Sequence, residues 1–182
     1  SGKLVVENFH GVPYQKPLTR LKETIGICKA LWRGERLAPE LSTLFDARHF
    51  KLEMTPVRAD IPIYVASLQD KAITEIGRCA DGWVPTFWPY QHLADGHALL
   101  AEGARAAGRD PGAIETAPFM AIVPLDDVDA ARTMIKPLVA FYIGGMGVYY
   151  HALFCRYGFK ENADLVRDLY QKGDRRQASA AV

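Results

Sequence analysis

The first half of the chain opens with a helical pattern of apolar residues. The spacing predicts an amphipathic helix over 19–33, and Gly34 can take the left-handed conformation that ends a helix. The residues that set this spacing are Leu21, Ile25, Cys28 and Trp32. The stretch that follows, 35–59, is mixed in character and contains two prolines, so we expect an excursion with at most a short strand at "HFKLE", residues 49–53.

Short apolar runs then alternate with helical patterns. We expect strands over 61–66, over 82–84 and within 114–125, separated by helices over 70–79 and 89–107. Strands that are apolar on both faces need cover on both sides, and this arrangement is typical of a parallel sheet built from βαβ units. The pattern therefore predicts an α/β fold whose three strands are parallel and adjacent in chain order, with helices on one side, as in an arc of a barrel.

The last third of the chain is predicted to be helical. Asp126 or Asp127 can cap the start of a long helix, in which Pro137 predicts a kink. Helical patterns continue through "YYHALFCRYG" and "NADLVRDLYQKG". Three glycines, Gly144, Gly145 and Gly147, predict a break between the long helix and these later helical patterns. We expect residues 1–182 to form a single domain.

The junction after the first predicted strand is a candidate binding loop. It consists of Ala66, Ser67, Leu68 and Gln69. Ligands of parallel sheets bind at the carboxyl ends of the strands, where helix N-termini offer free N–H groups. Two small residues would let a ligand approach the backbone, and Gln69 can donate a hydrogen bond. The alternative is a plain turn in which Ser67 or Asp70 caps the following helix.

Composition narrows the classes of protein. The 182 residues are 49% hydrophobic and 24% charged, and their net charge of +1 lacks the basic excess expected of a nucleic-acid-binding protein. Three widely separated cysteines, Cys28, Cys79 and Cys155, support neither a disulfide framework nor a CxxC site, which favours a reducing cytoplasm. No apolar run reaches the length of a membrane span, so we expect no membrane association.

Few residues suggest a metal site or a substrate pocket. His151 and Cys155 share a helix face, but with no third ligand apparent nearby in the sequence we favour simple packing and predict no metal. Thr86 and Phe87 lie in an aromatic segment that is either core or pocket wall, and we single them out as candidate substrate contacts. The segment 142–170 holds more aromatic residues than one helix face would hide, which predicts a homo-oligomer.

Several segments together resemble one known family. They are "SGKLVVENFHGVPYQKPLTRLKETI", "IPIYVASLQDKAITEIGRCADGW", "GRDPGAIETAPFMAIV", "DDVDAARTMIKPLVAFYIGGMG" and "RYGF". Their joint order is similar to that of luciferase-like monooxygenases, in the branch of oxidoreductases that use the deazaflavin coenzyme F420. The resemblance implies a (β/α)8 TIM barrel. Because such a barrel needs about 250 residues, we expect this chain to be an internal fragment of it, without the N-terminal strands and the C-terminal end.

The resemblance also implies a chemistry and a site. The expected function is hydride transfer between F420 and an organic small molecule, with an FMN-dependent monooxygenase as the alternative and a non-catalytic binding module as the alternative of another class. The coenzyme would contact a first loop of Ser1 and Gly2 and a second loop of residues 66–69. Many members have Gly-Pro where this chain has Gln69-Asp70, so an acidic side chain is expected near an anionic part of the coenzyme. No residue of this chain is assigned a catalytic role.

Overall fold

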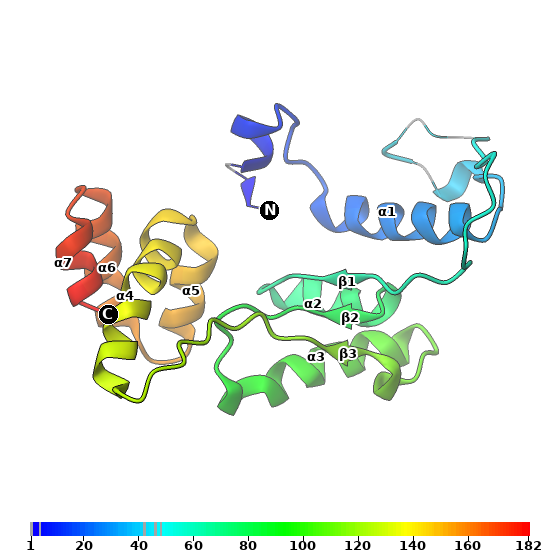
Figure 1. Cartoon of the computed structure of the whole chain (residues 1–182). Helices are drawn as coiled ribbons and strands as arrows, with labels where there is room; N and C mark the ends of the chain where they lie inside the picture. The colour runs from blue at the N-terminus through cyan, green and yellow to red at the C-terminus, as the bar shows by residue number, and fades with distance from the viewer. Residues whose placement is uncertain (1, 4, 42, 46, 48) are drawn as a thin grey trace. The chain divides into compact units, whose positions relative to one another are not determined.

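The computed structural model describes residues 2–3, 5–41, 43–45, 47 and 49–182 (Figure 1). The α-helices of this described part are α1 (Pro17–Trp32), α2 (Asp70–Cys79), α3 (Leu93–Ala106), α4 (Val128–Gly145), α5 (Val148–Arg156), α6 (Lys160–Gln171) and α7 (Arg175–Ala180). The strands are β1 (Tyr64–Val65), β2 (Gly82–Trp83) and β3 (Glu115–Thr116). Short 3-10 turns cover Pro39–Leu41, Tyr90–His92 and Pro111–Ala113, and a π-helical turn covers Val5–Phe9.

The three strands form a parallel sheet in the order β1-β2-β3, which confirms the predicted α/β arrangement. Val65 lies opposite Trp83, and Trp83 lies opposite Thr116. Beyond β2 and β3 one further parallel bridge joins Thr86 to Phe119. Each strand is shorter than the apolar run that predicted it, since only two residues of each run pair within the three-stranded sheet.

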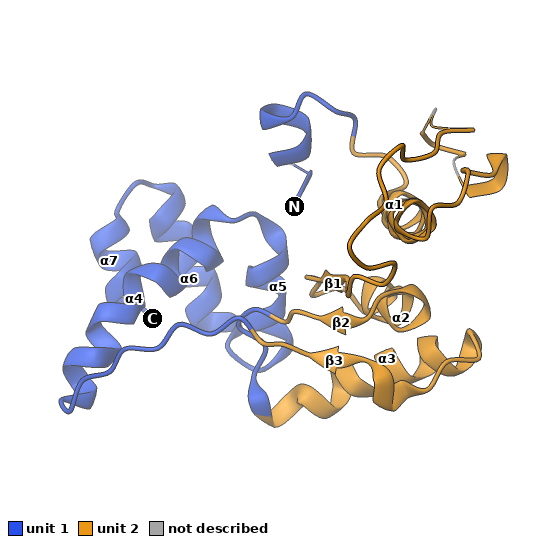
Figure 2. Cartoon of the chain, turned by 45° about the vertical axis from the view of Figure 1, so that its right-hand side comes forward, with its two compact units in different colours: residues 1–13, 86–90, 119–182 blue, residues 14–85, 91–118 orange. Residues whose placement is uncertain are grey.

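The described chain separates into two compact units, coloured in Figure 2. Unit 1 consists of residues 1–13, 86–90 and 119–182, and unit 2 of residues 14–85 and 91–118. Unit 2 holds the sheet with α1, α2 and α3, whereas unit 1 holds α4 to α7. That the whole chain forms one domain stays a prediction.

The centre of unit 2 is the contact between α2 and α3, which is the most extensive between any two elements. Helix α2 has the predicted bounds, and its side chains Ile73 and Ile76 are fully buried. On the sheet, Trp83 of β2 is also fully buried. These residues show why the sequence signal was strong here: α2 carries a sharply divided apolar face that the sheet and α3 cover.

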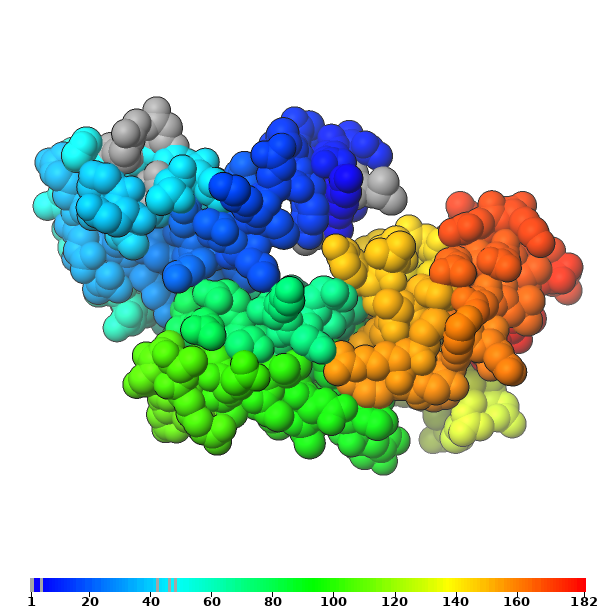
Figure 3. Space-filling model, turned by 180° about the vertical axis from the view of Figure 1, so that it is seen from behind, coloured from blue at the N-terminus to red at the C-terminus, as the bar shows by residue number. Residues whose placement is uncertain are grey.

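Unit 1 is a helical cluster in which α6 contacts α4, α5 and α7. In the space-filling view of Figure 3 the segments from α5 to α7, coloured orange to red, form one continuous body. Its buried core is made of small and branched side chains, namely Ala140, Ile143, Ala163, Val166 and Ala178. The predicted N-cap is confirmed at Asp127, whose carboxylate accepts from the amides of Asp129 and Ala130.

The excursion over 35–59 contains no strand at the described residues 49–53, where the sequence allowed a short one. Leu37 does exchange backbone hydrogen bonds with this stretch, since its N–H donates to the Phe50 carbonyl and its carbonyl accepts from the His49 N–H. However, His49 adopts a left-handed conformation with φ 65°, which interrupts any extended run. The third predicted strand is likewise reduced to β3, and its apolar continuation at Phe119 and Ile122 is exposed.

The predicted helix break is present between α4 and α5, and the three glycines have different roles in it. Gly144 and Gly145 are the last residues of α4, where side-chain atoms of Tyr170 lie close to both. Gly147 takes φ 84°, a conformation that favours glycine, and α5 begins at the next residue. Within the described residues no single helix has the length and apolarity to cross a membrane; α4 and α5 meet that test only as a pair bent by 109°.

One carboxylate, Asp81, ties together several elements of unit 2. Its Oδ1 accepts from Lys29 Nζ of α1 at 2.8 Å, and its Oδ2 accepts from the Ile63 N–H at 2.9 Å. Arg109 Nη2 lies 3.6 Å from the same Oδ1. Burial alone would raise the pKa of Asp81, but the hydrogen bonds from Lys29 and Ile63 and the charge of Arg109 hold this pKa below its ordinary value.

Replacing Asp81 with asparagine is expected to lower the free energy of unfolding at pH 7 by about 1–2 kcal/mol, because charged partners lose a charged acceptor. Since the folded pKa is depressed, this contribution is present above the unfolded pKa of about 4 and is lost as the pH falls through the folded pKa. Urea unfolding of parent and variant between pH 3 and 7 measures the difference, which should shrink toward pH 3. A difference that stays constant over this range contradicts the assignment. Asp129→Asn, at an exposed pair in the first turn of α4, is the control and should change the free energy of unfolding by less than about 1 kcal/mol.

Candidate functional site

The candidate loop 66–69 lies directly between β1 and α2, at the carboxyl end of the strand, as predicted. The alternative, in which Ser67 or Asp70 caps α2, is wrong about the capping residue. The N-cap residue is Gln69, and it makes no side-chain capping bond. Instead, Ser67 Oγ accepts from the Gln69 N–H at 3.2 Å, which tightens the turn before the helix begins.

A tryptophan of the neighbouring strand fixes this loop. The indole Nε1–H of Trp83 donates to the Ser67 carbonyl at 2.9 Å. Trp83 is fully buried and pairs with Val65 through the sheet register, so the loop backbone is held to the core two residues after β1 ends. The loop is therefore anchored to the neighbouring strand at Ser67.

The donors of the loop suit a neutral polar group. Ser67 Oγ already accepts a hydrogen bond, and its own proton has no acceptor among the described residues, so it can donate to a ligand. Gln69 is exposed and carries two amide donors and one acceptor. Asp70 places a carboxylate in the first turn of α2, where it interacts favourably with the dipole of the helix N-terminus. Its negative charge disfavours binding of a phosphate at the same place.

Thr86 and Phe87, the candidate substrate contacts, lie in unit 1. Phe87 has a positive φ of 56°, which is uncommon for a residue with a side chain. Its ring packs edge-on against Tyr142 at 4.7 Å and against Tyr150 at 6.3 Å between ring centroids. Burial raises the pKa of Tyr150, assisted by Tyr142 and opposed by a hydrogen bond with Thr86. These contacts assign Phe87 to an aromatic cluster, and a role in substrate binding stays a prediction.

The other half of the predicted cofactor site is the N-terminal loop. Ser1 lies outside the described residues. The Gly2 carbonyl accepts from the N–H groups of Val5 and Val6, both at 3.1 Å, and so closes a turn. A Cβ on Gly2 would stand 3.8 Å from the Tyr149 ring, an ordinary contact, so sterics do not require glycine here. That this loop meets residues 66–69 stays a prediction.

Parallel strands joined through helices are the repeating unit of a (β/α)8 barrel, and this chain contains three such strands in its described part. The sequence model of luciferase-like monooxygenases matches residues 1–182, and the chain belongs to this family. The fold agrees with that of a solved F420-dependent tetrahydromethanopterin reductase from Methanopyrus kandleri, with a TM-score of 0.78 and 20% identity, over 100% of this chain and 56% of the other.

Two curated relatives carry names that refer to F420. A Mycobacterium tuberculosis protein assigned as a coenzyme F420-dependent oxidoreductase is 30% identical over 204 aligned residues, which cover 100% of this chain and 57% of that protein. An F420-dependent hydroxymycolic acid dehydrogenase of the same organism is 35% identical over 121 residues, which cover 65% of this chain and 32% of the dehydrogenase. The chain thus spans little more than half the length of the first of these two relatives.

Proposed function

We propose that the full-length protein is an F420-dependent oxidoreductase and that residues 66–69 contact the coenzyme. The observation that carries the proposal is the anchored loop itself: its backbone is fixed by Trp83, and the Ser67 hydroxyl is left able to donate. Family membership and the F420-dependent relatives indicate which ligand this loop would bind.

When bound, the deazaflavin ring supplies hydride transfer, and the protein supplies position and polarity. In this chain Ser67 would donate to a carbonyl or hydroxyl oxygen of the coenzyme, and the Gln69 amide would bind a second polar atom. Asp70 sits at the start of α2 and would keep the polyanionic tail away from that helix end. The loop is therefore assigned to the uncharged part of the coenzyme, its ring or ribityl chain.

Replacing Ser67 with tryptophan in the full-length protein is expected to weaken F420 binding at least tenfold. The new side chain would fill the approach to the loop, while the half-buried position leaves β1 and α2 in place. Fluorescence titration with F420 measures the dissociation constant, and urea unfolding should differ from the parent by no more than about 1 kcal/mol. A parallel titration with FMN should show at least tenfold weaker binding to the parent protein.

A matched control uses the segment that leads into the same strand. Ala59 is exposed and lies in a bend five residues before β1, so Ala59→Trp adds the same bulk on the amino-terminal side of the strand and should leave F420 affinity unchanged. Equal affinity of the Ser67→Trp variant and the parent would remove residues 66–69 from the site. Preferential binding of FMN would favour the monooxygenase, and binding of neither coenzyme would favour the non-catalytic module.

Three further proposals accompany this function. The substrate is an organic small molecule that exchanges a hydride with F420, and the protein acts in the cytoplasm as a homo-oligomer. The aromatic residues that suggested an oligomer are partly accounted for inside unit 1, where Tyr142, Tyr150 and Phe154 surround Phe87. Exposed apolar side chains nevertheless persist in the same segment, including Val148 of α5 at 69% and Phe159, just before α6, at 53% exposure, and these support association.

A further inference from the structure

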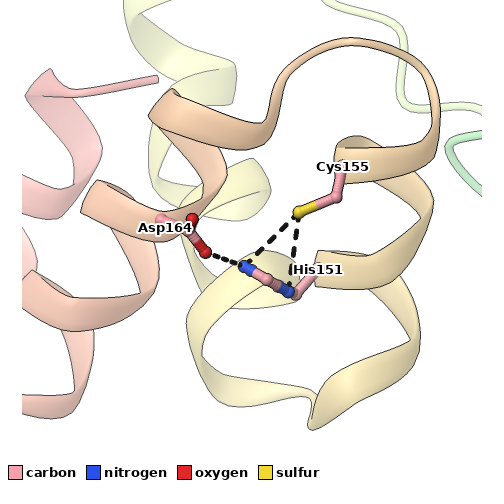
Figure 4. A group of neighbouring side chains, drawn as sticks. All are labelled: His151, Cys155 and Asp164. Carbon is pink, nitrogen blue, oxygen red and sulfur yellow. Dashed lines mark hydrogen bonds and ion pairs between the residues drawn. The ribbon is translucent and has the colours of Figure 1, made fainter.

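Three potential metal ligands meet between α5 and α6 (Figure 4). His151 and Cys155 lie on the same face of α5, and Asp164 of α6 faces them. His151 Nε2 lies 2.8 Å from Asp164 Oδ1, and Cys155 Sγ lies 3.6 Å from the same nitrogen. One ligand atom of each residue lies within 4.8 Å of the other two.

The contact between the two helices sets this geometry. Ala163 and Val166 hold α6 in the core of unit 1, against which Cys155 of α5 also packs. Gly158 adopts φ 95° in the connection and lets the chain reverse before α6 begins. The His151 side chain is only 12% exposed, whereas Asp164 is 32% exposed, so the cluster is sheltered but open to solvent on one side.

We propose that His151, Cys155 and Asp164 form a binding site for Zn²⁺ or a similar divalent transition metal, with water as the fourth ligand. Imidazole, thiolate and carboxylate are the ligand types that zinc prefers. Zinc bond lengths of about 2.0–2.3 Å place tetrahedral ligand atoms roughly 3.3–3.8 Å apart. The nitrogen–sulfur distance already falls in this range, and the nitrogen–oxygen pair needs to open by about 0.5 Å, which a side-chain rotation supplies.

Two cationic side chains now compensate the carboxylate. Lys160 forms an ion pair with Asp164 Oδ2, and Arg167 Nη2 lies 3.2 Å from Asp164 Oδ1. Arg167 Nη1 also lies 3.1 Å from His151 Nδ1, which accepts from it. The Arg167 guanidinium thus supplies beside Asp164 and His151 the positive charge that a bound metal would supply.

Metal binding and this position of Arg167 exclude each other. A metal on His151 Nε2 leaves the ring proton on Nδ1, where it would face an N–H of Arg167, donor against donor. Arg167 is 35% exposed and has Asp168 4.0 Å from its Nε, so it can swing toward that partner. The proposal therefore predicts that Arg167 lowers the affinity for metal and that removing it raises the affinity.

Titration of the full-length protein with Co²⁺, followed by competition with Zn²⁺, tests the site. We expect binding at equimolar metal, with the near-ultraviolet absorption of a thiolate–cobalt bond and visible bands of tetrahedral cobalt. Arg167→Gln should bind at least tenfold more tightly, because the amide oxygen of glutamine can accept from the Nδ1 proton. Asp164→Asn should bind at least tenfold more weakly.

Cysteine variants separate this site from adventitious binding. Cys155→Ser should abolish the thiolate–cobalt absorption, whereas Cys79→Ser, at a free cysteine of unit 2, should leave it unchanged. Circular dichroism of each variant confirms that it is folded. The proposal is overturned by cobalt spectra without thiolate absorption, by absorption that survives Cys155→Ser, or by Arg167→Gln binding no more tightly than the parent. Because F420 binding is not measured, these outcomes are independent of the proposed function.

Discussion

Replacing Gly103 with alanine is expected to lower the free energy of unfolding by about 3 kcal/mol, because α2 and α3 pack backbone to backbone at this residue. A Cβ on Gly103 would stand 1.8 Å from the Thr74 carbonyl oxygen and 2.8 Å from the Thr74 carbonyl carbon. Backbone atoms of a helix cannot turn aside as a side chain can. The helices would have to separate and so loosen the best-packed contact of unit 2.

The direction of this effect distinguishes packing from helix propensity. Alanine favours a helix over glycine by about 1 kcal/mol, so propensity alone predicts that Gly103→Ala stabilises the protein. Gly26 of α1 provides the matched control, because a Cβ there would meet Leu41 Cδ2 at an ordinary 3.5 Å. Gly26→Ala should be neutral or slightly stabilising in urea unfolding. Equal midpoints for Gly103→Ala and the parent would mean that the helices do not cross this closely.

The same contact explains which parts of the fold were predictable. The bounds of α2 followed from sequence because a divided apolar face and a polar opposite face occur together over ten residues. Gly77 of α2 and Gly103 of α3, which allow this close packing, carry no periodic signal in the sequence. Their role depends on which helix faces which. A Cβ on Gly77 would lie 2.1 Å from the Leu100 carbonyl oxygen, a fact that only the packed structure supplies.

The strands were predicted in position and order but not in length. Apolar composition marks a buried run, whereas strand bounds depend on which backbone groups pair, and pairing is set by the neighbour rather than by the run itself. At 49–53 the sequence allowed a short strand, but His49 takes a left-handed conformation, and the backbone–backbone hydrogen bonds of His49 and Phe50 among the described residues go to Leu37 and Ala47.

The candidate sites show the same division between local and long-range information. The position of residues 66–69 after β1 followed from the alternation of strands and helices, but the anchoring of Ser67 by Trp83 crosses two strands and depends on their register. His151 and Cys155 were visible as an i, i+4 pair. Asp164 was not, because its place beside them depends on how α6 packs on α5. The signal available in the sequence for this third ligand was an acidic residue, Asp164, in the helical segment that follows His151 and Cys155.

Replacing Trp83 with alanine is expected to lower the free energy of unfolding by about 4 kcal/mol. The side chain is fully buried, and it fills the space above Gly96 of α3, where a Cβ would stand 2.3 Å from the Trp83 Cη2 atom. Truncation therefore leaves a cavity between β2 and α3 that rigid neighbours cannot close. Trp32→Ala, at a half-buried tryptophan of α1, should cost only about 1 kcal/mol and serves as the control in urea unfolding.

Trp83→Phe separates the volume of the indole from its hydrogen bond. The smaller ring keeps most of the packing but leaves the Ser67 carbonyl without its donor, so we expect a loss of about 1–3 kcal/mol. Because that donor fixes loop 66–69, F420 affinity should fall about tenfold in this variant even under conditions where it is fully folded. A folded Trp83→Phe protein that binds F420 like the parent would show that the indole contributes to the stability of unit 2 and not to the geometry of the loop.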